Sequence, residues 1–206
     1  MEVKEKLYNL IAHTGINVMQ KMFPEYFATE PMRPTDRYIE YPWVIEALSR
    51  YPINILDVGC SGSMLPLMMC AIGHKVMGVD IRPYPMDNPN FLFQQIDVEK
   101  LLFDSHFHIV TAVSTVEHMG LNHRYGIVED AEKDLRAIEA MHQVLLPSGV
   151  LLMTVPFGEE YEVTKNHRIY NSHMLDLLMY KFHSYNYDVV PSPEADYQIA
   201  LIKAVK

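Results

Sequence analysis

Residues 55–63 read Ile55-Leu56-Asp57-Val58-Gly59-Cys60-Ser61-Gly62-Ser63, an apolar run that ends in an acid and two glycines. Such a run predicts a buried parallel strand and a tight turn, followed by a helix from about Met64 to Ala71. Glycine lets a ligand approach the backbone closely, and the start of a helix presents unpaired N–H groups. Strand, turn and helix together predict a nucleotide site.

The acid and the number of glycines narrow the class of ligand. A dinucleotide fingerprint has three glycines in GxGxxG spacing and binds a pyrophosphate, whereas this turn contains only Gly59 and Gly62. Asp57 stands before the first glycine, where a carboxylate suits a cationic or hydroxyl-rich ligand better than a phosphate. The turn therefore argues against a nicotinamide dinucleotide.

Composition bounds the kind of protein. With 206 residues, 49% of them hydrophobic and 21% charged, the chain is expected to fold as a globular protein with a substantial core. A net charge of −9 and the lack of any basic run disfavour a nucleic-acid partner. Cys60 and Cys70 are expected to be free thiols. No long apolar stretch is present, so we expect neither a signal peptide nor a membrane span, and a cytoplasmic location.

Strands and helices alternate after the glycine turn, which predicts a parallel sheet with helices on both faces. A helix is expected from about Glu129 to Leu145, and the further strands at Lys75–Asp80, Phe91–Asp97, Phe107–Ser114 and Val150–Val155, the last one ended by Pro156. The tail differs, because a helix that begins at Asn171 or Ser172 is followed by two strands with no helix between them, Tyr185–Val190 and Gln198–Val205. These two strands predict a hairpin.

We expect the chain to consist of an N-terminal segment, residues 1–41, and a main domain, residues 42–206. Apolar residues at helical spacing predict a helix from Val3 to about Lys21, and a second helix is expected from Pro42 to Arg50. Between them, four prolines predict a loop with a short helix over 23–42 that covers a substrate pocket. For the N-terminal helix, packing at the edge of the domain is at least as good an explanation as a role in the lid. The residues of the loop expected to contact substrate are Arg33, Arg37, Tyr38 and Tyr41.

The turn Asp57-Val-Gly59-Cys-Ser-Gly62-Ser resembles the first motif of the class I S-adenosylmethionine-dependent methyltransferases, with Ser61 and Ser63 at positions where glycine is commoner. The resemblance covers roughly Pro42 to Lys206. It implies a Rossmann-like α/β fold: a mostly parallel seven-stranded sheet with an antiparallel C-terminal hairpin and helices on both faces. S-adenosylmethionine is the cofactor that it implies.

Three acids at the ends of successive strands, Asp57, Asp80 and Asp97, are expected at the edge of the sheet where open α/β folds bind ligands. By resemblance, Asp57 lies near the amino-acid part of the cofactor, Asp80 accepts both ribose hydroxyls and Asp97 receives the adenine amino group. A carboxylate suits such roles because it accepts two donors at once. The cofactor-binding residues implied are Asp57, Gly59, Cys60, Ser61, Gly62, Asp80, Ile81, Asp97, Val98 and Ser114.

Residues 114–120, Ser-Thr-Val-Glu-His-Met-Gly, resemble the fourth motif of the same family, which borders both cofactor and acceptor. Ser114 then supports the cofactor, and Glu117 or His118 faces the reacting atom. Histidine is the natural base because it titrates near neutral pH, although both side chains have a packing role as the alternative. His167 and Arg168 form a second candidate cluster, catalytic and substrate-binding respectively.

The predicted function is methyl transfer from S-adenosylmethionine to a small molecule. An oxygen acceptor, with a sugar or glycan precursor as one case, is suggested by a likeness to methyltransferases of carbohydrate modification in Val-Asp-Ile-Arg-Pro-Tyr (79–84) and Val-Pro-Phe-Gly (155–158). No metal is expected, since no Cys-x-x-Cys or His-Glu-x-x-His spacing occurs. The alternatives are a non-catalytic cofactor-binding module for regulation or assembly, and a nicotinamide-dependent reductase, which the missing third glycine disfavours.

Overall fold

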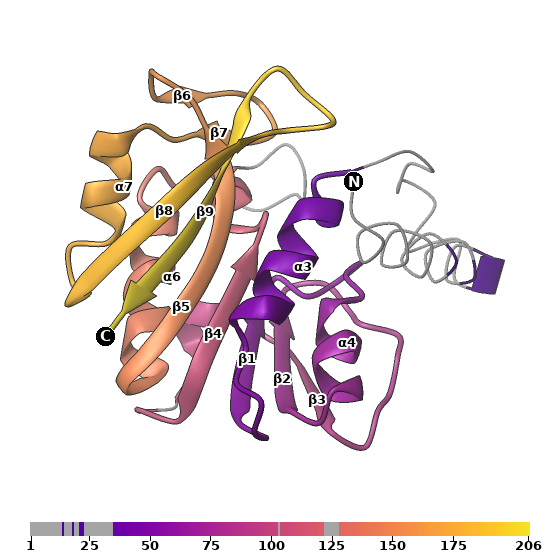
Figure 1. Ribbon diagram of the computed structural model, residues 1–206. Coiled ribbons are helices and arrows are strands. Elements are labelled where there is room, and N and C mark those ends of the chain that lie inside the picture. Colours follow the sequence, from indigo (N-terminus) through magenta and orange to yellow (C-terminus); the bar gives the residue numbers. More distant parts are fainter. Residues whose placement is uncertain (1–13, 15–17, 19–20, 23–34, 103, 122–127) are drawn as a thin grey trace.

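The computed structural model describes residues 35–102, 104–121 and 128–206, together with Thr14, Val18, Lys21 and Met22. Seven strands form one sheet in the order β3-β2-β1-β4-β5-β9-β8, and helices cover both of its faces (Figure 1). The pairs among β3, β2, β1, β4 and β5 are parallel, whereas β9 is antiparallel to both of its neighbours. The predicted fold is therefore confirmed, including the C-terminal hairpin.

The predicted alternation of strands and helices holds only in part: among the described residues no helix lies between β2 and β3, and only a 3₁₀ turn lies between β3 and β4. The first half contains α3 (Arg37–Ala47), β1 (Asn54–Val58), α4 (Leu65–Ala71), β2 (Lys75–Asp80), β3 (Phe91–Gln95), the 3₁₀ turn η1 (Val98–Lys100), β4 (Phe107–Val113) and the 3₁₀ turn η2 (Val116–His118). The second half contains α6 (Lys133–Val144), β5 (Leu145–Phe157), β6 (Glu162–Val163), β7 (Arg168–Ile169), α7 (Ser172–Leu178), β8 (Ser184–Pro191) and β9 (Gln198–Val205).

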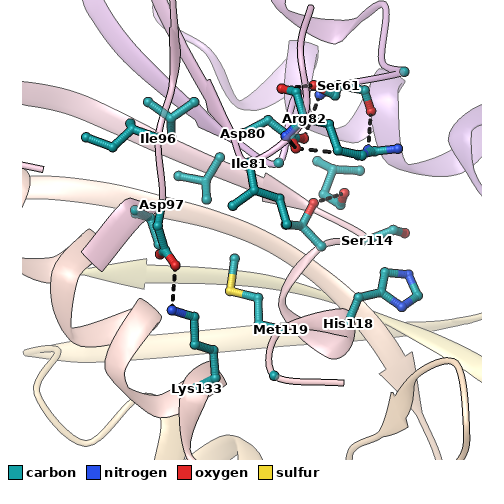
Figure 2. Close-up of a pocket in the computed structure, with 18 of the residues that line it drawn as sticks. Ser61, Asp80, Ile81, Arg82, Ile96, Asp97, Ser114, His118, Met119 and Lys133 are labelled. Carbon is teal, nitrogen blue, oxygen red and sulfur yellow. Dashed lines mark hydrogen bonds and ion pairs between the residues drawn. The ribbon is translucent and has the colours of Figure 1, made fainter. Parts of the chain in front are cut away.

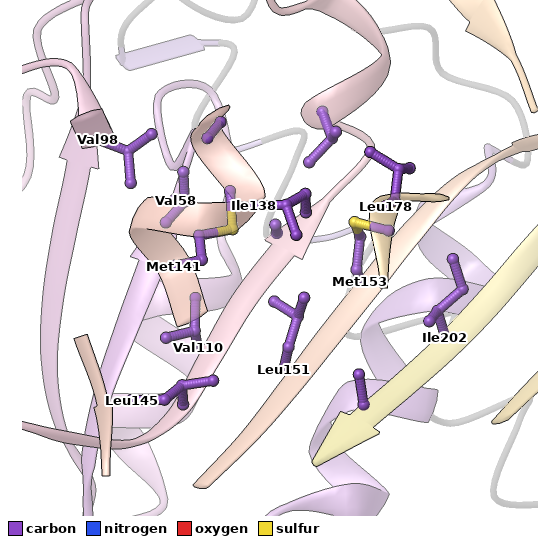
Figure 3. Packing of buried hydrophobic residues seen from close by; sticks show 14 of the residues in the cluster. Val58, Val98, Val110, Ile138, Met141, Leu145, Leu151, Met153, Leu178 and Ile202 are labelled. Carbon is purple, nitrogen blue, oxygen red and sulfur yellow. The ribbon is translucent and has the colours of Figure 1, made fainter. Parts of the chain in front are cut away.

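Two apolar layers hold the helices on the sheet. Successive strand residues point to opposite faces, so Ile55 of β1 packs with α3 and α4, whereas Leu56 packs with α6 and α7. Figure 3 shows the second layer, in which Ile138 of α6 lies near Val110 of β4 and Leu151 of β5. Burying each such side chain contributes about 1.5–3 kcal/mol. The central strands read as continuous apolar runs because both of their faces are covered.

Helix α3 begins at Arg37 and contains Pro42, so the prediction that this helix starts at Pro42 is wrong, and residues 37–41 of the predicted loop with a short helix belong to α3. Proline lacks an N–H, and inside a helix it removes one bond to the preceding turn. The start of the helix is nevertheless well anchored, because the amide of Glu40 donates to the carbonyl of Asp36 at 3.0 Å and the Glu40 side chain is fully buried. The predicted division between residues 41 and 42 falls inside this helix.

Residues 23–34, with Arg33, lie outside the described residues. Of the predicted N-terminal helix, only Thr14, Val18 and Lys21 are described, together with Met22 after it, and all four are helical.

Pro156 does not end β5, which continues to Phe157. The last paired residue of β4 is Val113, opposite Thr154, so Pro156 lies beyond the end of that neighbour. Its carbonyl accepts from the amide of Tyr170 rather than from β9. In a strand the N and C=O of one residue point to the same side, so the missing N–H of proline breaks no bond to β9.

Candidate functional site

A cavity of about 390 Å³ opens at the carboxyl ends of β1, β2, β3 and β4 (Figure 2). Its volume lies within the range of roughly 300–1,000 Å³ that is usual for small-ligand sites. It is also the edge where open α/β sheets bind their ligands. Of the residues predicted from the sequence, its wall includes Arg37, Gly59, Ser61, Gly62, Asp80, Ile81, Asp97, Val98, Ser114 and His118.

The glycine turn after β1 forms one side of the cavity. Gly59 has a φ of 77°, and a Cβ there would lie 2.1 Å from Cγ2 of Thr115, so a larger residue would clash with the turn after β4. Gly62 has a φ of 82°, and a Cβ there would meet nothing within 4 Å among the described atoms. The first glycine thus allows two loops to touch, and the second leaves the backbone open toward the cavity.

Asp80 is held by two backbone amides. The N–H of Ser61 donates to its Oδ2 at 2.9 Å, and the N–H of Arg82 donates to its Oδ1 at 2.8 Å (Figure 2). The Arg82 guanidinium donates back to the carbonyl of Ser61 at 2.7 Å. Nε of Arg82 also lies 3.5 Å from Oδ1 of Asp80. Each carboxylate oxygen has two lone pairs, so Oδ2, which the guanidinium does not face in this ion pair, keeps an acceptor position beyond its amide bond. The carboxylate therefore has a fixed orientation at the cavity wall.

The serines of the turn have structural roles that the sequence did not indicate. The hydroxyl of Ser61 donates to the carbonyls of Arg82 and Pro83, at 3.0 and 2.9 Å. The hydroxyl of Ser63 is hydrogen-bonded to Tyr41 at 2.8 Å, and its carbonyl accepts from Tyr84 at 2.8 Å. Serine at these positions thus ties the turn to the loop after β2 and to α3.

Asp97 lies at the opposite end of the cavity, in an ion pair with Lys133. The Lys133 ammonium is 2.6 Å from Oδ2 of Asp97 and 2.6 Å from Glu99 (Figure 2). Oδ1 of Asp97 accepts from the amide of Glu99 and so caps η1. Ile96 and Val98, on either side of Asp97, add apolar wall. This end of the cavity can hold a flat, largely apolar group that carries one polar edge.

Asp57 and Cys60 lie behind the wall of the cavity as far as the structure describes it. Asp57 is buried, and its Oδ1 accepts from the hydroxyl of Thr111 at 2.6 Å. Burial raises the pKa of Asp57 to about 7, and the charge of Asp80 acts in the same direction. Burial also raises the pKa of the Cys60 thiol, which makes it a poor nucleophile. These two side chains support the turn from beneath.

His118 reaches the cavity from η2 (Figure 2). Its Nδ1 lies 2.5 Å from the carbonyl oxygen of Asn166, and because a carbonyl only accepts, Nδ1 carries the proton of this hydrogen bond. In the neutral ring the acceptor lone pair is then on Nε2, which lies 3.5 Å from Oε1 of Glu117. Glu117 is buried behind His118, and the His167 ring lies 6.5 Å from the His118 ring. Of the three predicted catalytic residues, His118 is the one in the cavity wall as described.

The predicted substrate-binding residues separate into two groups. The Arg37 side chain lines the cavity, whereas Tyr38, Tyr41 and Arg168 do not belong to its wall as described. Arg168 is 1% exposed, and its guanidinium donates to the carbonyl of Met119 at 2.5 Å. It also lies 3.5 Å from Asp134 of α6. The prediction for Arg168 is therefore corrected: this buried cation fixes the loop after His118 from below.

Several residues of the site were missed by sequence reasoning: Arg82, Glu129, Asp130 and Lys133 belong to the described cavity wall, and Glu40 and Thr154 lie behind it. Glu40 is fully buried and bonded to Ser114 and Thr154, and Lys133 pairs with Asp97. An acid within the aromatic stretch Tyr38-Ile39-Glu40-Tyr41 was the available signal for Glu40. For Lys133 and Thr154 the sequence offers no signal, because a lysine at the start of a helix and a threonine in a strand are common in any fold.

A metal site and a membrane-spanning helix are both absent from the described residues. No group of three or more His, Cys, Asp or Glu side chains among them is arranged to hold a metal ion. Within the same residues, no helix has the length and apolar character needed to cross a membrane.

Sheet order, the glycine turn and the cavity together define the fold of the class I S-adenosylmethionine-dependent methyltransferases. The chain is similar to a Burkholderia thailandensis 1,6-didemethyltoxoflavin-N1-methyltransferase, solved with 1,6-didemethyltoxoflavin and S-adenosylhomocysteine, at a TM-score of 0.66 and 16% identity over 98% of this chain and 89% of that one. It is also similar to the N-methyltransferase NodS from Bradyrhizobium japonicum WM9, solved with S-adenosylhomocysteine, at a TM-score of 0.62 and 13% identity over 84% and 88% of the two chains.

Two sequence matches cover parts of the chain. A family model described as a Caenorhabditis protein of unknown function, DUF268, matches residues 92–193. A ubiquinone biosynthesis O-methyltransferase from Albidiferax ferrireducens is 31% identical over 78 residues, which are 32% of this chain. The match spans 31% of the length of that relative. The resemblance seen in the glycine turn is thus confirmed at the level of the fold.

Proposed function

We propose that this protein is an S-adenosylmethionine-dependent methyltransferase that acts on a small molecule. The observation that carries the proposal is Asp80, whose carboxylate is fixed by the amides of Ser61 and Arg82 at the wall of the cavity, next to the open glycine turn. A fixed carboxylate with an acceptor position left is suited to the hydroxyls of a ribose. The similar proteins solved with S-adenosylhomocysteine support the same cofactor.

The remaining contacts follow from the position of Asp80. The backbone at Gly59 and Gly62 would lie along the amino-acid part of the cofactor, and Ile81 and Val98 would enclose the adenine, with Asp97 at its amino group. When bound, the cofactor supplies an electrophilic methyl group on a sulfonium. The protein has to orient the acceptor, exclude water and remove a proton.

We assign the removal of the proton to His118. The carbonyl of Asn166 holds Nδ1–H, which leaves the lone pair on Nε2 to take a proton from the acceptor. Glu117, 3.5 Å from Nε2, stabilises the imidazolium that results. Arg37, which also lines the cavity, is positioned to contact an acceptor. His167 supports the His118 ring from outside the described cavity wall.

The acceptor atom is proposed to be oxygen, and a sugar or glycan precursor is one class to test. The partial match to an O-methyltransferase supports oxygen, whereas the similar structures named above are N-methyltransferases. A net charge of −9 favours a neutral or cationic acceptor over a nucleic acid. A panel of hydroxylated and amine acceptors, assayed by transfer of a labelled methyl group, decides between the two atoms.

Calorimetry followed by turnover tests the proposal. The protein should bind S-adenosylmethionine and S-adenosylhomocysteine and not NADH. Absence of binding to both methionine derivatives would refute the proposed function. Binding without transfer to any acceptor of the panel would instead support a non-catalytic cofactor-binding module.

A further inference from the structure

A closed network of hydrogen bonds joins α3 to the ends of β4 and β5. Oε1 of Glu40 accepts from the hydroxyl of Ser114 at 2.6 Å and from the hydroxyl of Thr154 at 2.5 Å. The amide N–H of Ser114 in turn is shared between Oγ1 of Thr154 at 3.0 Å and the carbonyl oxygen of Thr154 at 3.2 Å, so the side-chain hydroxyl adds to a backbone bond. Oε2 of Glu40 accepts from the guanidinium of Arg37 at 2.6 Å. Glu40 and Thr154 are fully buried, so water does not replace these bonds.

The network surrounds a residue in an unfavourable backbone conformation. Ser114 has a φ of 43°, in the left-handed region that residues other than glycine rarely adopt. Such a conformation costs on the order of 1–3 kcal/mol and persists only when the surrounding contacts enforce it. Glu40 and Thr154 hold both the hydroxyl and the amide of Ser114, which are the groups that would move if its φ changed.

The position of Ser114 connects this strain to the cavity. β4 ends at Val113, and Ser114 is the residue at which the chain leaves the sheet and turns toward η2. Four residues later His118 enters the cavity wall, where Ser114 itself is also exposed (Figure 2). A change in the backbone at Ser114 would therefore displace His118.

We infer that Glu40 is a positioning residue of the site: through Thr154 it holds Ser114 in its left-handed conformation and thereby places His118 in the cavity. The effect of Glu40 on turnover rests on the proposed function. The effect of the network on the backbone at Ser114 does not, and it is measured on the protein without cofactor.

Thr154→Val is the first test, because valine keeps the shape of threonine and removes its hydroxyl. The exchange rates of the Ser114 and His118 amides, followed by NMR, should rise about tenfold, the effect of losing one to two hydrogen bonds of ordinary strength. Thr154→Ser retains the hydroxyl and should exchange as the wild type does. Unchanged amide exchange in a folded Thr154→Val variant would overturn the inference.

Ser114→Gly separates backbone strain from the lost hydroxyl. Glycine adopts a positive φ without cost, so the loop should no longer depend on the network. Thr154→Val should therefore raise the exchange rate of the His118 amide by about twofold or less in the Ser114→Gly background, compared with about tenfold in the wild type. Equal increases in the two backgrounds would show that the network does not hold the turn, and would overturn the inference.

Turnover gives the second readout. Thr154→Val should lower kcat about 10- to 100-fold, as expected for a misplaced base, while KM for S-adenosylmethionine changes less because Asp80 lies on another strand. Glu40→Gln keeps an oxygen for the two hydroxyls but turns an amide toward Arg37, so its effect should be smaller and in the same direction. Equal changes in kcat and KM for Thr154→Val would contradict a positioning role.

Tyr180→Phe is the control. It also removes a hydroxyl from a carboxylate, that of Glu139 at 2.6 Å, but on α6 and outside the described cavity wall. It should leave kcat and the exchange rate of the His118 amide unchanged. If the wild type binds neither S-adenosylmethionine nor S-adenosylhomocysteine, the proposed function fails, and the exchange measurements still decide on Glu40.

Discussion

The two walls of the cavity are built in different ways. The wall formed by β1 and β2 is closed by contacts between segments about 20 residues apart, since Ser61 and Asp80 are separated by 19 positions and Tyr84 and Ser63 by 21. The wall formed by the turn after β4, with β5 behind it, joins distant parts of the chain. Glu40 lies 74 positions from Ser114 and 114 from Thr154.

This difference explains which parts of a site a short motif can encode. One strand–helix–strand unit fixes the first wall, so its turn and its acid recur at a set spacing in the sequence. The second wall exists only once α3, β4, β5 and the loop at Asn166 have come together. Glu40 and Thr154, which hold this wall, carry no local pattern, whereas Ser114 and His118 belong to the motif at residues 114–120. It is also the wall that faces the acceptor in the proposed function.

The largest effect is expected in the second wall. His118→Ala should lower kcat by about 10²- to 10⁴-fold, the usual contribution of general acid–base catalysis, while the affinity for S-adenosylmethionine measured by calorimetry stays nearly the same. Loss of both together would indicate a structural role for His118.

Two variants of neighbouring residues decide whether His118 is the base. His167→Ala removes the ring 6.5 Å from His118 and should have a smaller effect on kcat, because His167 lies outside the described wall of the cavity. Glu117→Gln should lower kcat less than His118→Ala does, because it removes the charge that stabilises the imidazolium but leaves the base in place. If His118→Ala retains full activity and one of these two does not, the role of base moves to that residue.

The backbone of the first wall should be the next most sensitive feature. Gly59→Ala should destabilise the fold by about 3 kcal/mol, because it combines a left-handed φ with a Cβ 2.1 Å from Thr115. Gly62→Ala has a similar φ but open space, so its cost should be about 1 kcal/mol. Urea unfolding measures both. Equal losses would mean that the contact with Thr115 is relieved by a shift of the loop.

The acid of the first wall should affect binding rather than folding. Asp80→Ala should raise Kd for S-adenosylhomocysteine about 10- to 150-fold, since a hydrogen bond to a charged group contributes about 1.5–3 kcal/mol. Asp87→Ala, which removes an exposed carboxylate from the same loop, is the control and should leave Kd unchanged. Unchanged affinity in a folded Asp80→Ala variant would exclude Asp80 from the cofactor site.

Much of the first wall was predictable from the sequence for a physical reason. Both faces of the central strands are covered, so β1 and β2 appear as apolar runs, and the acid and glycine that follow mark the point where each leaves the core. The turn at Gly59 and the carboxylate of Asp80 were therefore placed correctly on the cavity. Asp57 lies behind the described wall instead, where its side chain accepts a hydrogen bond from Thr111. The sequence shows that Asp57 belongs to a strand, but not toward which face of the sheet its side chain points.

The errors have a common cause in tertiary contacts that override local preference. Pro42 predicts the start of a helix, but the anchored first turn of α3 extends the helix back to Arg37. Pro156 predicts the end of a strand, but β4 has already ended and no ladder bond is lost. Arg168 was expected to bind substrate in a second cluster with His167, and its burial under Met119 depends on the packing of α6. The contacts of Arg168 and the pairing of β5 with β4 are not local in sequence.

The smallest predicted effect concerns Asp36, which ties the second wall to the C-terminal hairpin. Its carboxylate accepts from the hydroxyl of Ser192 at 2.6 Å, and its amide donates to Glu194 at 2.8 Å. Burial raises the pKa of Asp36 from 3.8 to about 6; the Ser192 hydrogen bond and the charge of Arg37 oppose this, and the charges of Glu40 and Glu194 add to it.

Between pH 3.8 and about 6 the folded chain therefore holds a proton on Asp36 that the unfolded chain has lost, so this group makes stability fall as the pH rises through that window. Asparagine does not ionise. Asp36→Asn should thus gain roughly 1 kcal/mol relative to the wild type between pH 4 and pH 7.5, less than the full pKa difference implies because water screens part of the charge. Urea unfolding at the two pH values measures this gain.

Ser192→Ala should act in the opposite direction, because it removes the donor that stabilises the ionised carboxylate, and its loss of stability should be larger at pH 7.5 than at pH 4. If both variants respond to pH as the wild type does, the carboxyl of Asp36 ionises with water access, and the hairpin contact does not bury it in solution.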